Sequence, residues 1–535
     1  MNNPDLNHKF SLTTPLYYVN GVPHIGSAYT TMVADAIARF QRLQGKSVLF
    51  ITGTDEHGQK IQRTAESEGV EPQVHCDRIV ASFQTLWTKL DIKYDRFSRT
   101  TAPKHKQIVD EFFDRVWKQD DIYLARQQGW YCVSCEEFKE ERELIEDHYC
   151  AIHTNKQAEW RDEENYFFRL SKYQQQLEEL YESQPDFIQP PSRRNEVLNF
   201  VKQGLTDFSI SRVNLDWGFP IPTDDKHTIY VWFDALLGYV TALLEPDAEP
   251  TLDNALAQWW PIDLHLIGKD ILRFHAVYWP AMLASAGLPL PKKVFGHGFL
   301  TKDGLKMGKT LGNTIDPIDL VDRYGADAVR YYFLKEIELG NDGDFNETRF
   351  INVLNKDLAD VLGNSLNRTL GMLKKYCQSN VPQLSIANYS PDHPLTKIGF
   401  ALGEKVIRAY ENLQISQACT EILILVRAVN NYIDESAPWT LFKQQQHAEI
   451  EQILYAALES IRLSAYLLSP VIPTTSSKIY QQLGFDWDFN QDRLDGGIER
   501  AEAFQTHAKW GELPFSETLG KASPVFAKLE LAPED

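Results

Sequence analysis

The sequence has few cysteines, more acidic than basic residues and no long apolar run. Six cysteines in 535 residues are too few for a disulfide scaffold. No apolar run reaches the length of about 18 residues that a transmembrane helix needs, so no membrane partner is expected. Residues 1–10 are polar and lack the apolar core of a signal peptide. We therefore expect a cytoplasmic protein.

The charge balance argues against a general polyanion binder. The chain has 54 Lys and Arg against 74 Asp and Glu, which gives a formal net charge of −20. Non-specific nucleic-acid binding depends on neutralising phosphates, which an acidic surface does not do. A local basic surface on an acidic protein remains compatible with this composition.

Two short motifs carry most of the functional signal. Pro23-His24-Ile25-Gly26-Ser27 joins an apolar strand to a helix, and offers an imidazole, a small glycine and a helix N-terminus that favours anions. Lys306-Met307-Gly308-Lys309-Thr310 places two lysines in a glycine-rich loop. Either motif alone is weak, since a lysine-rich loop is usually only solvated. Together, in this order, they predict an ATP site in which the α-phosphate is attacked.

The pattern around the first motif predicts a Rossmann-like, doubly wound α/β fold. Apolar strands are expected at 10–14 and 48–51, each followed by a loop and a helix. Helical spacing of Met32, Ala36 and Phe40 ends at Gly45, the expected helix stop. The α/β pattern resumes further on, with strands expected at 228–233, 264–267 and 293–295. Ligands bind at the carboxyl ends of strands in such sheets, and the first motif falls there.

The rest of the chain divides into an insertion and a helical domain. Charged and aromatic residues mark 120–221 as an insertion, and long helical patterns at 354–376, 395–413, 416–435 and 450–468 predict a bundle. The expected division is a catalytic domain at 1–119 and 222–297, the insertion at 120–221, a lysine-loop region at 298–350, a helical domain at 351–500 and a tail at 501–535.

The insertion contains two ligand pairs with equal spacing, Cys132–Cys135 and Cys150–His153. Tight turns that aim two such ligands at one ion are the usual way to build a tetrahedral zinc site. A closed set of three cysteines and one histidine predicts one structural Zn²⁺. The alternative, unrelated thiols, is disfavoured by the repeated spacing.

With these motifs in order along nearly the whole chain, the sequence resembles the methionyl-tRNA synthetases, a family of class I aminoacyl-tRNA synthetases. It is similar to the compact form with a single zinc knuckle. Further matching stretches are residues 13–26, 52–60 and 230–235, Gly268-Lys-Asp-Ile271 with His275, and Ala437-Pro-Trp439.

The resemblance implies a methionine–tRNA ligase. Such an enzyme converts L-methionine and ATP, with Mg²⁺, to methionyl adenylate and pyrophosphate, and then charges the 3′ end of initiator and elongator methionine tRNA. It implies that His24, Lys306 and Lys309 are catalytic. The ATP-binding residues that it implies are His24, Gly26, Ser27, Lys306, Met307 and Lys309.

Two residues depart from the family motifs. Ser27 stands where a second histidine is usual, so one imidazole donor is missing, and Ser27 is expected to cap the helix or donate one hydroxyl bond. Gly308 stands where serine is usual and loses a hydroxyl. Neither change removes the charges that the chemistry requires.

The resemblance also implies binding sites for methionine and for the anticodon. The methionine-binding residues are Leu16, Tyr18, Asp55, Trp232, Ala235, Tyr239, Ile271 and His275. In this set Asp55 holds the ammonium group, and Tyr239 and His275 can donate to the sulfur. The residues that read the CAU anticodon are Asn364, Arg368 and Trp439. Taken singly, the aromatic residues are more often core, Asp55 a helix cap, and Asn364 and Arg368 a surface pair.

Other readings are less well supported. Synthetases for leucine, isoleucine or valine usually carry a much larger editing insertion, and a cysteine enzyme would place zinc in its amino-acid pocket. An inactive RNA-binding relative would not keep His24, Lys306, Lys309 and Asp55. A small-molecule nucleotidyltransferase would not need the helical domain. A short tail after Phe515 leaves no room for the dimerising barrel of some family members, so a monomer is expected.

Overall fold

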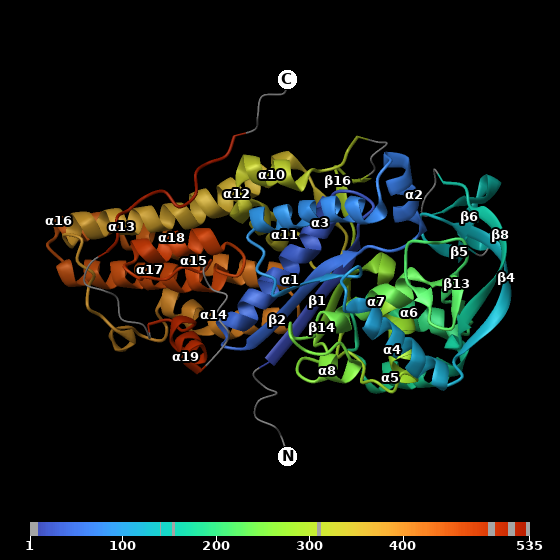
Figure 1. Ribbon diagram of the computed structural model, residues 1–535. Coiled ribbons are helices and arrows are strands. Elements are labelled where there is room, and N and C mark those ends of the chain that lie inside the picture. Colours follow the sequence, from blue (N-terminus) through green and yellow to red (C-terminus); the bar gives the residue numbers. More distant parts are fainter. Residues whose placement is uncertain are drawn as a thin grey trace, which may run out of the picture.

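The computed structural model describes residues 9–139, 141–151, 156–307, 312–490, 498–511 and 519–530 (Figure 1). A parallel sheet with its helices lies at the centre, an antiparallel insertion lies at one end and a helical bundle extends from the other. Within the described ranges, each helix is too short or too polar to cross a membrane.

Six parallel strands form the central sheet, in the order β3-β2-β1-β14-β15-β9. Their bounds are β1 Lys9–Tyr18, β2 Ser47–Asp55, β3 Arg96–Arg99, β9 Ile188–Gln189, β14 Leu264–Gly268 and β15 Val294–His297. The strands predicted at 10–14, 48–51, 264–267 and 293–295 are confirmed. Because β1 lies between β2 and β14, the winding reverses beside β1, and a crevice is expected at the carboxyl ends of β1 and β14.

Helix α1 (Ile25–Leu43) connects the sheet to the bundle and is buried along nearly its whole length. Its predicted apolar face is confirmed, and Gly45 follows it with the positive φ of +87° that suits a glycine stop. On the bundle side, the ring of Phe40 stacks on Tyr410 with centroids 3.8 Å apart. The helix that begins at the first motif therefore ends in the helical domain.

The prediction of a strand at 228–233 is wrong. Strand β13 (Asp224–Ile229) ends within this run and pairs antiparallel with β11 (Ser211–Arg212) and β12 (Pro220–Ile221). Helix α7 (Val231–Thr241) then begins at Val231. A short apolar run fits a buried strand and a buried helix equally well, and most of α7 is buried.

The insertion forms a four-stranded antiparallel sheet in the order β10-β8-β4-β5. Its bounds are β4 Ile122–Cys132, β5 Glu137–Lys139, β8 Glu159–Phe168 and β10 Phe208–Ser209. Helices α5 (Gln174–Ser183) and α6 (Pro191–Lys202) follow, with β9 between them. Strand β9 pairs with β15, so this part of the insertion joins the central sheet.

The predicted helical bundle is confirmed. Its main helices are α13 Asn364–Tyr376, α14 Pro394–Glu411, α15 Ile415–Ser436, α17 His447–Leu468 and α18 Pro473–Gln482. Helix α12 (Glu347–Leu354) and a π-helical stretch, Asn355–Gly363, lead into α13. Their apolar residues share one continuous core with α1, so the bundle is packed against the catalytic sheet rather than tethered to it.

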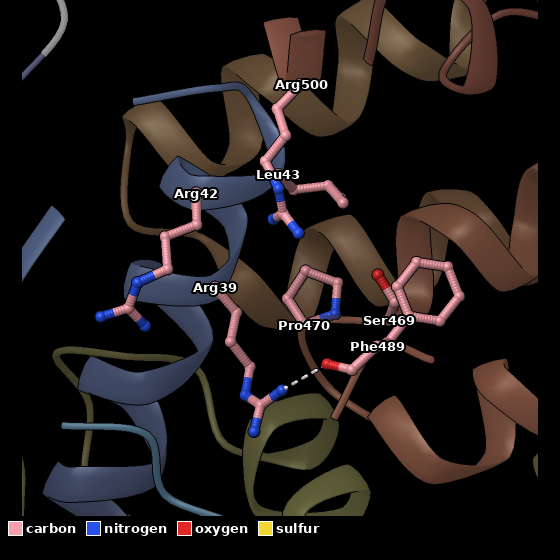
Figure 2. Close-up of a pocket in the computed structure, with 7 residues that line it drawn as sticks. All are labelled: Arg39, Arg42, Leu43, Ser469, Pro470, Phe489 and Arg500. Atoms are coloured by element: carbon pink, nitrogen blue, oxygen red, sulfur yellow. Dashed lines mark hydrogen bonds between the residues drawn. The ribbon is translucent and has the colours of Figure 1, made fainter. Parts of the chain in front are cut away.

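Buried charges join α1 to the chain beyond α17. Asp35 accepts from Arg39 Nε at 2.7 Å and lies 2.7 Å from Arg330 Nη2. Figure 2 shows Arg39 donating to the carbonyl of Phe489, at 3.1 Å. Arg330 donates to the carbonyls of Pro470 and Val471. These guanidinium groups thus satisfy backbone carbonyls that would otherwise be buried without partners.

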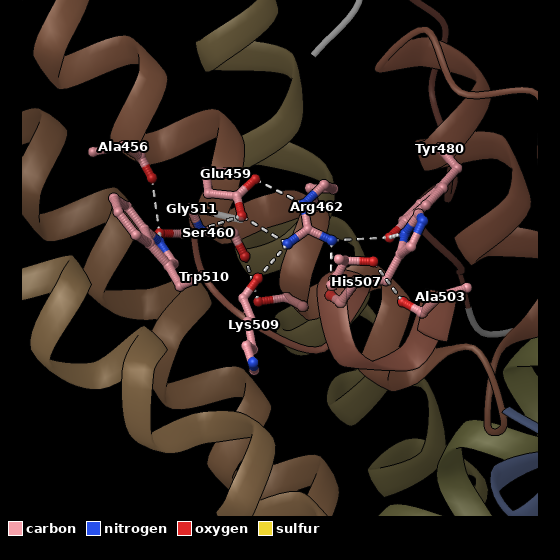
Figure 3. Close-up of polar contacts among 12 residues, drawn as sticks. Ala456, Glu459, Ser460, Arg462, Tyr480, Ala503, His507, Lys509, Trp510 and Gly511 are labelled. Atoms are coloured by element: carbon pink, nitrogen blue, oxygen red, sulfur yellow. Dashed lines mark hydrogen bonds and ion pairs between the residues drawn. The ribbon is translucent and has the colours of Figure 1, made fainter. Parts of the chain in front are cut away.

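A second buried network holds helix α19 (Ile498–His507) against the bundle. Figure 3 shows Arg462 paired with Glu459, both fully buried, with the nearer contact at 2.7 Å. Arg462 also donates to the carbonyls of His507 and Lys509, each at 2.8 Å. One guanidinium therefore bridges α17 and the end of α19. Loss of Arg462 leaves the two carbonyls without this donor and leaves Glu459 with the Gly511 N–H, at 2.7 Å, but without a charge partner.

We predict that Arg462→Met lowers the free energy of unfolding by about 3–5 kcal/mol, because it leaves Glu459 as a buried, uncompensated charge. Urea unfolding followed by circular dichroism measures this change. The matched control is Arg408→Met, since Arg408 pairs with Glu404 at 3.5 Å on the surface, where both side chains are at least 75% exposed. The control should cost less than about 1 kcal/mol. Equal losses in the two variants would contradict the assignment.

Candidate active site

The first motif forms the N-terminus of α1, at the carboxyl end of β1. His24 is the N-cap residue, and its Nδ1 accepts from the backbone N–H groups of Gly26 and Ser27, at 3.1 and 3.3 Å. A neutral imidazole that accepts at Nδ1 carries its proton on Nε2. The cap therefore fixes His24 in the tautomer that can donate through Nε2 to a ligand at the helix N-terminus.

Gly26 and Ser27 both support this cap. A Cβ atom at position 26 would lie 2.9 Å from Cε1 of His24, so only glycine leaves room for the ring. Ser27 Oγ donates to the His24 carbonyl and accepts from the His24 N–H, at 2.9 and 3.2 Å. Of the two roles expected for Ser27, its hydroxyl performs the capping role.

A buried imidazole lies behind the first turn of α1, contributed by His297 at the end of β15. Its Nε2 lies 2.7 Å from Thr30 Oγ1, and its Nδ1 lies 2.8 Å from the carbonyl of Gly298. The Nδ1–H donates to that carbonyl, so Nε2 accepts from Thr30. Sequence reasoning did not single out His297, although a polar residue ending a buried strand was a signal for it.

The lysine loop begins as a β-hairpin rather than as an irregular loop. Strand β16 (Leu300–Lys302) pairs antiparallel with β17 (Leu305–Lys306). Asp303 and Gly304 connect them with φ of +54° and +75°, the pattern of a type I′ turn. The hairpin carries Lys306 on an exposed strand, and Asn313 donates to the Lys306 carbonyl at 3.2 Å. Lys309 and Gly308 lie outside the described residues.

Most of the predicted methionine-binding residues line one pocket at the carboxyl end of β1. The lining residues are Pro15, Leu16, Asp55, Trp232, Ala235, Leu236, Tyr239, Ile271 and His275. They come from β1, β2, α7 and the segment after β14, which converge at the crevice. Tyr18 is absent from this lining, and its hydroxyl instead donates to Glu136 Oε1 at 2.9 Å.

Asp55 is the acidic group of the pocket. It is 6% exposed, and its Oδ1 has no hydrogen-bond partner among the described residues. Burial, together with the nearby carboxylates of Asp234 and Glu136, raises the pKa of Asp55 well above its ordinary value. Because an ammonium ion would relieve this penalty, the carboxylate is suited to bind a cationic ligand group.

At the other side of the pocket, Tyr239 and His275 form a neutral pair. Nδ1 of His275 lies 3.1 Å from the Ile271 carbonyl, and Nε2 lies 2.8 Å from the Tyr239 hydroxyl. Burial lowers the pKa of His275 to about 4, so the ring is uncharged at neutral pH. Its Nδ1–H donates to Ile271, and Tyr239 donates to Nε2. Both protons are thus engaged within the protein, and donation to the sulfur stays a prediction.

A second buried group, next to the pocket, consists of Asp234 and two histidines. The two carboxylate oxygens of Asp234 lie 2.6 Å from His57 Nδ1 and 2.8 Å from His105 Nε2. Although burial opposes its ionisation, the two histidines lower the pKa of Asp234 to about 2. Since Asp234 lies on α7 beside Ala235, this ionised network fixes the helix that supplies one wall of the pocket.

Three of the four predicted metal ligands lie together in the insertion. The Sγ atoms of Cys132, Cys135 and Cys150 are all within 4.8 Å of one another, and those of Cys135 and Cys150 are 3.6 Å apart. Sulfur atoms on a tetrahedral zinc ion, with bonds of about 2.3 Å, are separated by about 3.8 Å. The cluster could therefore hold a metal ion. His153 lies outside the described residues.

The predicted anticodon residues lie on α13 and α16 (Pro438–Lys443), and α16 lies at the end of the bundle away from the central sheet (Figure 1). Asn364 is exposed on α13, one turn before Arg368, whose Nη2 contacts Asp434 of α15 at 2.5 Å. Trp439, on α16 (Pro438–Lys443), is 41% exposed rather than core. Asp434 lies just before the turn into α16, so the three residues belong to one end of the domain.

Comparisons with known proteins agree with this architecture. The family described as tRNA synthetases class I (M) matches residues 10–150 and 139–370, and the anticodon binding domain of methionyl tRNA ligase matches 401–506. The chain is 68% identical to a methionine–tRNA ligase of Synechocystis, with 98% of each chain covered, and 54% identical to the chloroplastic/mitochondrial enzyme of Arabidopsis thaliana, covering 99% of this chain and 84% of that one. Mycobacterium tuberculosis methionyl-tRNA synthetase, in complex with methionyl-adenylate, superposes with a TM-score of 0.88 at 38% identity, over 97% of this chain and 99% of that one. The chain belongs to the class I methionyl-tRNA synthetase family.

Proposed function

For this member of the methionyl-tRNA synthetase family, we propose the residues that carry out each step of the family's reaction. The enzyme is a methionine–tRNA ligase: it forms methionyl adenylate from methionine and ATP, and transfers methionine to tRNA. The observation that carries the assignment of residues is the buried Asp55 Oδ1, which has no partner among the described residues, in a pocket otherwise formed by neutral groups.

Methionine binds with its ammonium group on Asp55 and its side chain against Leu16, Trp232, Ala235, Tyr239, Ile271 and His275, while Tyr18 supports the site from beside it. A thioether is a weak acceptor and needs little more than an apolar cavity of suitable shape. The neutral Tyr239–His275 pair keeps this cavity free of charge.

The methionine carboxylate then attacks the α-phosphate of ATP. The carboxylate is already ionised, so no general base is needed, and catalysis consists of positioning and charge stabilisation. His24 donates from Nε2, and Gly26 and Ser27 hold its ring at the helix N-terminus. Lys306 and Lys309 neutralise the triphosphate as Met307 anchors the loop. Mg²⁺ accompanies ATP and screens its charge.

In the helical domain, Trp439 stacks on an anticodon base, and Asn364 and Arg368 bind base edges or phosphate. We propose that the chain divides into the catalytic domain (1–119, 222–297), the insertion (120–221), the lysine-loop region (298–350), the bundle (351–500) and the tail (501–535). Because one chain carries both the proposed adenylate site and the proposed anticodon site, we propose a monomer. We place it in the cytoplasm, where thiols stay reduced and can bind metal.

The ammonium site gives the first functional prediction. Asp55→Ala should reduce kcat/KM for methionine in pyrophosphate–ATP exchange by about 10²-fold or more, because the ammonium loses its buried partner. The control is Asp225→Ala, at an exposed carboxylate. Only methionine among the amino acids should drive strong exchange. Unaltered methionine affinity in Asp55→Ala would refute the assignment.

The knuckle gives a second prediction. We propose one structural zinc ion held by Cys132, Cys135, Cys150 and His153, with Zn–S bonds of about 2.3 Å. Elemental analysis should find one zinc per chain. Cys135→Ser should lower this content and loosen the insertion to proteolysis, since metal binding contributes folding free energy. Cys377→Ser, a half-buried thiol elsewhere, should keep the metal. Metal-free protein from chelator-free preparations would count against the site.

The anticodon site gives a third prediction. Trp439→Ala should leave pyrophosphate exchange nearly unchanged, because Trp439 lies in another domain from the ATP loops. It should lower kcat/KM for aminoacylation of methionine tRNA by at least the equivalent of one lost base stack, about 1–3 kcal/mol. Phe400→Ala, which removes another exposed aromatic side chain of the bundle, is the control. Equal loss of exchange and aminoacylation would show that Trp439 is only structural.

A further inference from the structure

One side chain of the cysteine knuckle points out of the knuckle and into the catalytic domain. Glu136 directly follows Cys135 and adopts a φ of +57°, yet it is only 4% exposed. Its carboxylate contacts three groups: Oε1 accepts from Tyr18 Oη at 2.9 Å and from the Lys60 N–H at 2.7 Å, and Oε2 accepts from Tyr131 Oη at 3.3 Å. Two of these groups, Tyr18 at the end of β1 and Lys60 at the start of α2, belong to the catalytic domain.

The contact with Lys60 makes Glu136 a helix cap supplied from another part of the chain. Helix α2 (Gln59–Glu68) begins after Gly58, which has no side chain to cap it. Glu136 provides the missing acceptor to the second residue of the helix, and its charge suits the positive end of the helix dipole. The N-terminus of α2 is thus fixed by a residue more than 70 positions later in the sequence.

The contact with Tyr18 reaches the end of the strand that flanks the ammonium site. Tyr18 and Asp55 are the last residues of β1 and β2, and they are paired in register. Residues 55–58 then connect Asp55 directly to the start of α2. Glu136 therefore holds both neighbours of Asp55: the strand end beside it and the helix that follows it.

Gly58 shows how tightly this corner is packed. Its φ is +112°, and a Cβ atom there would lie 2.8 Å from Tyr18 Oη and 2.9 Å from Glu136 Oε1. If Glu136 served only to fasten the knuckle, an apolar side chain would do so without the cost of burying a carboxylate. The buried charge is explained by the donors that it binds.

We propose that Glu136 is a positioning residue for methionine: it fixes Tyr18 and the cap of α2, and thereby orients Asp55 toward the substrate ammonium. Because Glu136 adjoins Cys135, the metal-bound fold of the knuckle sets the position of its carboxylate. Metal in the knuckle and methionine in the pocket are then coupled. This inference rests on the proposed role of Asp55.

The first test compares Glu136→Ala and Glu136→Gln with the adjacent control Glu137→Ala. Glu137 is half-buried, pairs with Lys139, and contacts neither α2 nor Tyr18 in any hydrogen bond of the described residues. Glu136→Ala should weaken equilibrium methionine binding, measured by calorimetry, by about ten- to a hundredfold, the effect of losing a charged hydrogen-bond acceptor. Glu136→Gln should lie between alanine and wild type, and metal content and the KM for ATP should stay unchanged.

The second test removes the metal. Stripping the wild-type enzyme with a chelator should weaken methionine binding to the level of Glu136→Ala, and stripping Glu136→Ala should cause little further loss. Gly58→Ala crowds both Tyr18 Oη and Glu136 Oε1 at a strained φ but changes no residue of the knuckle, so it should weaken methionine binding with one metal ion retained. If Glu136→Ala itself loses metal, methionine binding by Gly58→Ala becomes the measurement that tests the inference.

Wild-type methionine affinity in Glu136→Ala with its metal retained, or in Gly58→Ala, overturns the inference. So does an equal effect of chelation in wild type and Glu136→Ala. Asp55→Ala, measured alongside, separates the two proposals. If it binds methionine normally, the proposed ammonium site is wrong; if it fails to bind while the Glu136 and Gly58 variants are normal, only the present inference falls.

Discussion

The carboxylate of Asp35 is the interaction on which the arrangement of the two halves depends. It is fully buried in the middle of α1, between the guanidinium groups of Arg39 and Arg330. Burial opposes its ionisation, but the two arginines hold the pKa of Asp35 below its usual range. Since Arg39 and Arg330 also bind carbonyls beyond α17, one ion cluster joins the helix of the ATP motif to the chain that closes the bundle.

The catalytic site is built on this fixed helix. His24 caps its first turn, His297 contacts Thr30 in the next turn from the sheet, and the proposed methionine pocket opens at the neighbouring strand ends. The insertion is attached at the same place, through Glu136 and the N-terminus of α2. Residues from four distant stretches of sequence therefore meet within one crevice, which the reversal of winding beside β1 creates.

The sequence predicted those parts of the structure that local patterns determine. Hydrophobic spacing located β1, β2, α1 and the bundle helices, and the cysteine spacing located three thiols that the structure brings together. The run 228–233 was misread because its periodicity does not distinguish a buried helix from a strand. The hairpin before Lys306 was missed, although Asp303-Gly304 is a typical type I′ turn sequence. Glu136 and His297 were missed for another reason: their roles arise only from contacts between distant segments, which one sequence does not reveal.

The continuity of α1 has a consequence for how the enzyme measures its nucleic-acid substrate. The helix has 19 residues, so it spans about 28 Å between the phosphate-facing turn at His24 and the bundle. Rotating the bundle about it would pull the carbonyls of Pro470, Val471 and Phe489 away from Arg330 and Arg39 and leave buried groups without partners, which the fold opposes. Under the proposed function, this buried packing holds the adenylate site and Trp439 at a fixed separation. A tRNA substrate must then span this separation between its 3′ end and its anticodon.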